Sequence, residues 1–242
     1  MRLFKKILKI TAFTLLFLIA LAFAAPFIFK AQILSLAKKE INKSINAKAD
    51  FTDISISFFR DFPKVSVALE GLSVVGINDF EGDTLIAAKE IDAALNFMSV
   101  IKGSDYRIYS VAINEPRIHA IVHKDGKANW DISKPDTTTA TAEAPKPYKL
   151  NLQHYSISNG YISYDDAAGN MSTEIINLNH EGSGDFTSDL FTLQTNTTAD
   201  KVSFSYGGIP YLAKANTTID ADIEIDNKTN TYSFKKADVL LN

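Results

Sequence analysis

The chain has 242 residues, 46% of them hydrophobic, with 25 Lys and Arg against 28 Asp and Glu. This content is enough for a sizeable core, and the length corresponds to one domain or two small ones. Because the chain has no cysteine, disulfides, cysteine-ligated metals and thiol nucleophiles are excluded, and an exported domain must rely on its own packing.

The charge changes sign along the chain. Residues 1–50 hold nine Lys and Arg and two acidic residues, a net charge of +7, whereas the remainder holds 16 basic and 26 acidic residues, a net charge of −10. A basic segment favours anionic lipid head groups, and an acidic body repels the phosphates of nucleic acids. We therefore expect membrane lipids as partners and no nucleic acid.

Residues 10–29, ITAFTLLFLIALAFAAPFIF, contain no charged residue. As a helix they would span roughly 30 Å, the hydrocarbon thickness of a bilayer, so they predict a transmembrane helix. Residues 1–9 carry four basic residues and no acidic one, and the positive-inside rule keeps such a segment in the cytoplasm. The prediction is a single-pass membrane protein with a cytoplasmic N-terminus and an exported body.

A cleaved signal peptide is the alternative, because Ala22, Ala24 and Ala25 resemble a small-residue cleavage site. The apolar run, however, continues through residues 26–29, past any such site, and Pro26 would stand close behind a cut made after Ala24. The sequence therefore favours an uncleaved anchor.

Residues 31–49 predict an amphipathic helix, because apolar residues recur at helical spacing among lysines. Two interpretations are open: a surface helix that covers a sheet, and a helix that lies on lipid head groups. The apolar positions are Leu34, Ala37, Ile41 and Ile45.

From Phe51 the apolar period changes from 3.6 to 2, and strands are expected to follow one another to the end. Residues 51–132 form the first predicted β segment. Residues 133–149, SKPDTTTATAEAPKPYK, lack large aliphatic residues and predict a linker or a long excursion. Residues 150–242 form the second β segment, expected to continue the same sheet. The predicted fold class is mainly β: an elongated, antiparallel, curled sheet after the two helices.

Two segments resemble each other: VAINEPRIHAIVHKDGKAN at 111–129 and YSISNGYISYDDAAGNMS at 155–172. Each has alternating apolar residues, a break at Pro116 or Gly160, an isoleucine two residues later and a turn glycine. Strand pairs of fixed period are what a repetitive sheet requires, although hairpin-forming strands alone can give such a likeness.

No catalytic or metal-binding pattern stands out, and we expect neither an enzyme nor a cofactor. His119 and His123 have the spacing of a helical zinc pair, but they lie in a predicted strand, where four residues cover about 13 Å. Asp165 and Asp166 precede a turn, where aspartate is favoured without any catalytic role.

The order of these features resembles the N-terminal part of the AsmA family. The most specific parts are Phe62-Pro63, the P-x-I at 116–118 and G-x-A-N-W-D at 126–131. The resemblance implies an inner-membrane anchor, a periplasmic body and a role in outer-membrane biogenesis. It also implies a likeness to chorein-type bridge proteins, whose U-shaped β groove carries lipid chains between membranes.

If the sheet is such a groove, one apolar row of the alternating strands lines its interior. An ordinary β-sandwich core is the alternative, because alternation alone does not distinguish a dry core from a lipid-filled groove. The proposed lining residues are Val65, Val67, Leu69, Ile91, Leu95, Ile108, Val111, Ile113, Ile118 and Val122.

Two functions follow from these expectations. One is handling or transport of phospholipid in the groove. The other is a non-enzymatic, membrane-tethered scaffold or regulator of outer-membrane protein assembly or of protein targeting to the membrane, which binds envelope proteins. About a dozen strands at ~4.8 Å each extend only about 60 Å, too short for a bridge across the periplasm. The final stretch, TYSFKKADVLLN, alternates without a closing turn, which is expected of a piece of a longer protein.

Overall fold

The computed structural model describes residues 28–57, 64–96, 107–134 and 152–242, together with residues 6, 9–11, 13, 14 and 17. The chain divides into two compact units, Met1–Glu40 and Ile41–Asn242. Most of the predicted span at 10–29 and the predicted linker from residue 135 lie outside the described residues. Among those that are described, no helix combines the length and the apolar character needed to cross a bilayer.

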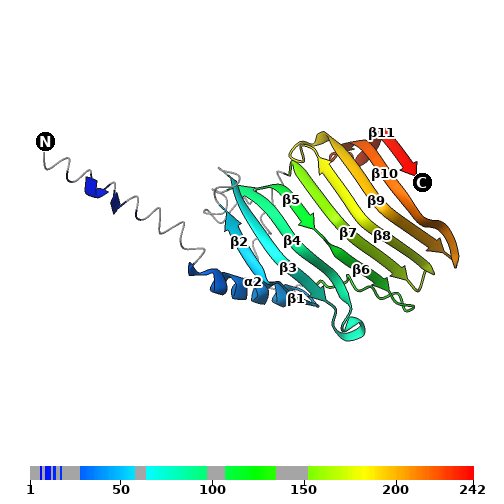
Figure 1. Ribbon diagram of the computed structural model, residues 1–242. Coiled ribbons are helices and arrows are strands. Elements are labelled where there is room, and N and C mark those ends of the chain that lie inside the picture. The colour runs from blue at the N-terminus through cyan, green and yellow to red at the C-terminus, as the bar shows by residue number, and fades with distance from the viewer. Residues whose placement is uncertain are drawn as a thin grey trace. The chain divides into compact units, whose positions relative to one another are not determined.

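The described part consists of one long helix, one short 3-10 helix and eleven strands (Figure 1). The elements are α2 (Lys30–Ser44), β1 (Lys48–Asp50), β2 (Asp53–Ser57), β3 (Lys64–Val75), η1 (Asn78–Phe80), β4 (Thr84–Asn96), β5 (Ile108–Asn114), β6 (Arg117–Val122), β7 (His154–Asp166), β8 (Met171–Ser183), β9 (Leu190–Tyr206), β10 (Ile209–Asp226) and β11 (Thr231–Leu241).

Helix α2 ends at Ser44, earlier than the helix expected over residues 31–49. In the last turn of the helix, the Asn42 side chain bonds the backbone of β1: its Nδ2 donates to the carbonyl of Ala49 at 2.7 Å, and its Oδ1 accepts from the N–H of Ala49 at 2.9 Å. Lys134 Nζ donates to the carbonyls of Asn42 and Lys43 at 3.0 Å each. A cation is favourable at this end of the helix dipole, and the chain turns from helix into β1.

All eleven described strands, from both sides of the predicted linker, belong to one sheet. The main path runs β1-β3-β4-β5-β7-β8-β9-β10-β11, while β2 pairs with β3, and β6 pairs with β4 and β7. The prediction of a wholly antiparallel sheet is wrong, because β7 runs parallel to β5 and β6. Residues 123–153 form a connection long enough for the crossover that parallel pairing requires.

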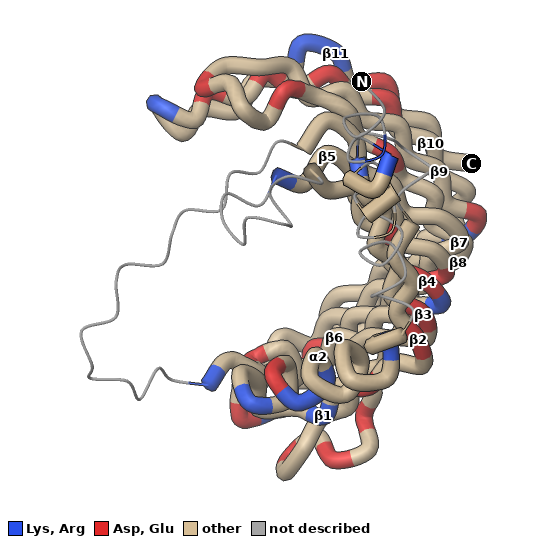
Figure 2. Tube along the Cα trace, turned by 90° about the vertical axis from the view of Figure 1, so that its left-hand side faces the viewer, with Lys and Arg blue, Asp and Glu red and all other residues tan. Residues whose placement is uncertain are grey.

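The sheet is a single curved layer. In Figure 2 the strands follow an open arc, with β1 towards one end and β11 towards the other. All described strands belong to one sheet, and in Figure 2 they follow one another along the arc in a single layer. This arrangement is not the β-sandwich that the sequence left open.

A line of residues in the left-handed backbone region crosses the sheet; we call it the transverse seam. Its members lie in β3, between β5 and β6, and in β7, β8 and β10. They are Gly71, Glu115, Asn159, Asn177 and Lys214, with φ values of 62°, 48°, 54°, 56° and 58°. A left-handed residue interrupts the two-residue alternation of side chains and bends the strand. Four of the five carry a side chain, which makes this conformation less favourable than it is for glycine.

Polar contacts hold the seam together. Lys89 Nζ lies 2.7 Å from Glu115 Oε1. The backbone N–H of Asn159 donates to Asn179 Oδ1 at 3.1 Å, and Asn177 Nδ2 donates to Asp200 Oδ2 at 2.8 Å. The interrupted strands therefore keep hydrogen-bond partners where the regular ladder is disturbed.

Candidate functional site

Pairing between strands aligns apolar side chains into rows that run across the sheet. On one side of the transverse seam, Leu69 of β3 pairs with Ile91 of β4, which pairs with Ile113 of β5 and then Ile157 of β7. A parallel row consists of Val67, Ala93, Val111 and Tyr155. Directly opposed positions share a face of the sheet, so each row forms one apolar stripe.

A further row crosses the other side of the seam, and it consists of isoleucine and valine. Its members are Val74, Ile86, Ile118, Ile162, Ile175 and Val202, from β3, β4, β6, β7, β8 and β9. In this row the paired residues Ile118 and Ile162 are 44 positions apart in the sequence, and the paired residues Val111 and Tyr155 are separated by the same number. The two similar sequence segments are therefore neighbouring, parallel parts of the sheet.

The apolar residues change from odd to even numbering at the seam. In β3 the apolar residues are odd-numbered before Gly71 and even-numbered after it; in β7 the change occurs at Asn159. On each side of the seam the apolar residues thus occupy one face of the strands, and the residues of the other parity are mostly polar. The opposite face is polar: His119, Ser163, Glu174 and Ser203 form one of its rows. We call the surface formed by the three apolar rows the apolar face.

The ten residues predicted to line a groove occupy three groups of the apolar face. Val65 lies beside Leu95, which pairs with Ile108. Val67 and Val111 flank Ala93, and Leu69, Ile91 and Ile113 are consecutive neighbours. Ile118 and Val122 lie beyond the seam on β6. Of the ten, only Val65 is fully buried; the other nine keep part of their surface accessible.

Sequence reasoning missed residues of β7, β8 and β9 that extend the same rows. Tyr155, Ile157 and Ile162 continue the face, although their alternation was visible. Tyr155 also contacts the ring of His180, with 5.4 Å between centroids, and His180 Nε2 lies 3.2 Å from the Tyr155 hydroxyl. Burial lowers the pKa of His180 and raises the pKa of Tyr155, so both are neutral near pH 7.

The G-x-A-N-W-D segment has a structural role at Asn129, which is 3% exposed. Its Oδ1 accepts from the N–H of Ile121 at 3.0 Å, and its Nδ2 donates to the carbonyl of His119 at 2.7 Å. The backbone N–H of Asn129 also donates to the Ile121 carbonyl at 3.0 Å. Asn129 thus supplies β6 with hydrogen-bond partners that a regular strand would provide.

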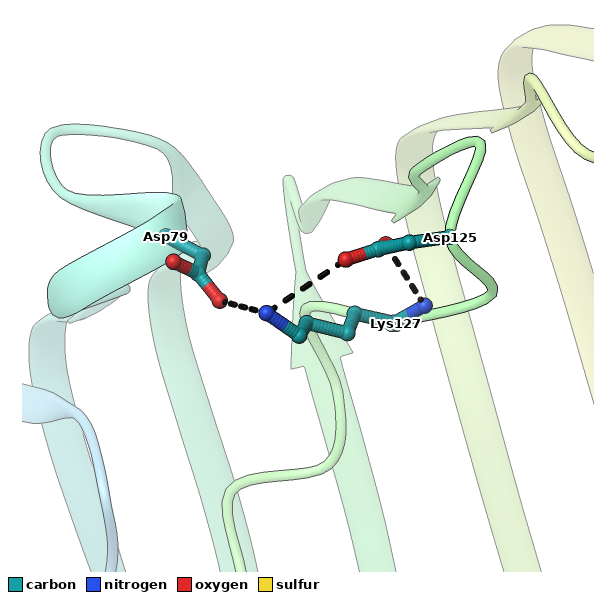
Figure 3. Close-up of polar contacts among 3 residues, drawn as sticks. All are labelled: Asp79, Asp125 and Lys127. Atoms are coloured by element: carbon teal, nitrogen blue, oxygen red, sulfur yellow. Dashed lines mark hydrogen bonds and ion pairs between the residues drawn. The ribbon is translucent and has the colours of Figure 1, made fainter.

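Asn129 also lines a cavity of about 750 Å³ that lies between two turns and is open to solvent. Its lining comes from Asn46, residues 76–80 and residues 125–132. Figure 3 shows its ion pairs: Lys127 Nζ lies 2.6 Å from Asp79 Oδ2 and 3.4 Å from Asp125 Oδ2. The Asp79 carboxylate, and after it Asp125, raises the pKa of Lys127. The backbone N–H of Lys127 lowers the pKa of Asp125.

The other candidates from the sequence have local contacts. The His119 ring lies 6.2 Å from that of Tyr161, and the His123 ring lies 4.4 Å from that of Phe80. Asp166 Oδ1 accepts the Gly169 N–H at 2.7 Å, as a turn aspartate does. In the part of the chain that the structure describes, no group of three or more His, Asp or Glu side chains is arranged to hold a metal ion.

Comparison with known proteins gives one family. The model of the AsmA family matches residues 1–238. No curated protein and no solved structure matches the chain. The match includes the strands that carry the apolar face and the turns that enclose the cavity.

Proposed function

The chain belongs to the AsmA family, and we propose that it handles or transports phospholipid along the apolar face, as a protein of cell-envelope biogenesis. One observation carries the proposal: continuous rows of aliphatic side chains cross a curved, single-layer sheet, and beyond the end at Val74, where Ile41, Ile45 and Ile132 pack, they remain partly accessible. Contiguous accessible apolar surface is a common feature of lipid and protein binding sites. Its linear rows suit extended acyl chains.

The driving force for such binding is apolar burial. Each methylene transferred from water to an apolar surface contributes about 0.8 kcal/mol, so a stretch of ten methylenes offers about 8 kcal/mol before the cost of ordering the chain. The rows are built from branched aliphatic residues, which give no hydrogen-bond donors to fix a ligand's orientation. We therefore expect the face to accept acyl chains with little selectivity for length.

The location belongs to the same proposal. An uncleaved helix over residues 10–29 would anchor the chain in the inner membrane, with residues 1–9 in the cytoplasm and the sheet in the periplasm. The role is non-enzymatic, since holding and moving a lipid needs no bond cleavage.

The test is lipid retention by the full-length protein, purified in detergent and analysed by mass spectrometry. Val111→Asp places a carboxylate on the apolar face, and Ala112→Asp places the same group on the neighbouring, exposed position of β5. Because Val111 is only partly buried, the carboxylate can reach water and the domain should stay folded by circular dichroism. We expect Val111→Asp and Val67→Asp to lose most bound lipid and Ala112→Asp to keep it.

Two results would reject lipid handling. One is the absence of phospholipid from the wild-type protein purified under mild conditions. The other is retention of equal lipid by Val111→Asp and Ala112→Asp while both remain folded.

A protein-binding scaffold is the second candidate, and exposed aromatic residues favour it. In the β9–β10 hairpin, Tyr206, Ile209 and Tyr211 are 54%, 58% and 60% exposed. Aromatic side chains are enriched in protein interfaces, so this hairpin is the proposed contact for an envelope protein. Replacing Tyr206 and Tyr211 by Ser should abolish cross-linking to an envelope protein and leave bound lipid unchanged; unchanged cross-linking would argue against this contact.

A further inference from the structure

The cavity between the two turns lies directly beside the apolar face. Ile132, which lines the cavity, packs against the buried cluster that contains Val74, a member of the isoleucine and valine row. Trp130, another lining residue, contacts Tyr164 with 6.0 Å between ring centroids. Tyr164 pairs with Ala120 and lies two positions after Ile162 of the same row. A lipid lying on this side of the seam would therefore bring its polar end near the cavity.

The charged groups of the cavity favour a cation over an anion. Its lining contains three carboxylates, those of Asp79, Asp125 and Asp131, and one ammonium group, that of Lys127. Lys127 is already paired with Asp79 and Asp125. An incoming phosphate thus meets a paired lysine and a net negative charge, whereas an incoming ammonium meets surplus carboxylate oxygens.

Trp130 adds a second feature that suits a cation. It is 45% exposed, although one side contacts Tyr164. An indole face attracts ammonium groups more strongly than other aromatic side chains do, and carboxylates nearby add to that attraction. The cavity volume of about 750 Å³ lies within the usual range for small-molecule sites.

We propose that this cavity binds the ammonium end of a zwitterionic phospholipid head group, of the phosphatidylethanolamine type. The inference rests on the proposed lipid handling and adds selectivity to it: the apolar face accepts the acyl chains, and the cavity selects the head group. Trp130 stacks on the ammonium group, and the surplus carboxylates among Asp79, Asp125 and Asp131 balance its charge.

The chain offers a built-in reporter, because Trp130 is its single tryptophan. The full-length protein in a non-ionic detergent would be titrated with dihexanoyl phosphatidylethanolamine, with dihexanoyl phosphatidylglycerol, and with glycerophosphoethanolamine, which has the head group but no acyl chains. We expect a saturable change in Trp130 fluorescence with the first lipid, at a concentration at least about tenfold lower than any change with phosphatidylglycerol. Glycerophosphoethanolamine should give the same change at higher concentration.

Two variants separate charge recognition from folding. Asp79→Asn with Asp125→Asn removes two carboxylates and leaves Lys127, so the preference should move towards phosphatidylglycerol by about tenfold or more. Lys124→Ala changes an exposed charge that does not line the cavity, and the preference should not change. Equal responses to both lipids in the wild type, or the same preference in the double variant, would overturn the proposal.

A second measurement distinguishes this inference from the lipid proposal itself. Trp130→Leu should retain as much total lipid as the wild type but with a smaller share of phosphatidylethanolamine; an unchanged share contradicts head-group selection. Loss of selectivity with lipid still bound would leave the apolar face as a lipid site. A response to glycerophosphoethanolamine in a protein that retains no lipid would support the cavity and reject lipid handling by the sheet.

Discussion

At the scale of single residues, the Asn129 side chain makes hydrogen bonds to β6 that a neighbouring strand would otherwise make. Its amide bonds two backbone groups of β6, at Ile121 and His119. Asn129→Ala would remove both hydrogen bonds and leave two part-buried backbone groups without this partner, at a cost of about 1–3 kcal/mol each. We expect the free energy of unfolding in urea to fall by about 2–4 kcal/mol. Asn216→Ala, at an exposed position of β10, serves as the control; similar losses in both variants would contradict this role.

His180 makes stability depend on pH. Burial lowers its pKa, while the Glu181 carboxylate acts weakly in the opposite direction. The unfolded chain has an ordinary histidine pKa of about 6.5, so below that pH the unfolded state binds more protons than the folded state does. Stability should therefore decrease as the pH falls from about 7 towards the folded pKa.

The measurement is urea unfolding at pH 7.5 and pH 5.5. His180→Gln should show a smaller loss between these two values than the wild type. His154→Gln, at an exposed position of β7, should behave like the wild type. If His180→Gln loses as much stability as the wild type, then other groups cause the acid sensitivity.

Some of these residue positions could be predicted from the sequence, and others could not. Alternation placed Val67, Leu69 and Ile91 together because period-2 spacing fixes the face of a strand residue. Asn129 was recognised only as part of a family motif, since its partners His119 and Ile121 lie across a turn whose geometry the local sequence does not determine. The Trp130 cavity likewise needs two turns that are distant in sequence.

At the scale of elements, the transverse seam sets the geometry of the apolar face. Lys214 of β10 has φ of 58°, and its side chain is exposed. Left-handed backbone costs an ordinary residue about 1–2 kcal/mol, and a β-branched residue more. Lys214→Gly should therefore match or exceed wild-type stability, whereas Lys214→Val should lose about 1–2 kcal/mol in thermal or urea unfolding. Equal stability of the two variants would mean that the left-handed conformation is not maintained in solution.

Strand pairing was harder to predict than strand position. Alternating residues look the same in parallel and antiparallel strands, so the parallel pairs of β7 with β5 and β6 were not expected. Their cause is the long connection over residues 123–153, which lets the chain return to the same end of the sheet. The offset similarity of residues 111–129 and 155–172 was the available signal, because parallel repeats align like with like.

At the scale of the whole molecule, alternation alone left a groove and a sandwich equally open. The difference lies in what covers the apolar face, and coverage is a tertiary property that a strand pattern does not contain. The described strands form one layer, and nine of the ten predicted lining residues keep accessible surface. Variation of the apolar face should therefore change ligand binding before it changes folding.

Two groups of charges compete to set the orientation of the whole chain across the membrane that we propose it spans. Four basic residues lie in 1–9, and five lysines lie in 30–48, on the other side of the predicted span. Basic residues close to a span favour the cytoplasmic side, and the first group precedes the span directly. A periplasm-dependent reporter fused after Asn242 should therefore be active, and the purified chain should retain residues 1–29.

The variant that replaces Arg2, Lys5, Lys6 and Lys9 by Gln leaves only the second group. Its five lysines should then hold the following chain in the cytoplasm for a large share of the molecules, and reporter activity should fall. A variant with Lys38, Lys39 and Lys43 replaced by Gln is the matched control and should keep full activity. An inactive wild-type fusion would place the apolar face on the cytoplasmic side of the membrane, the wrong side for a periplasmic role. An N-terminus found near Ala25 would replace the anchor by a cleaved signal peptide.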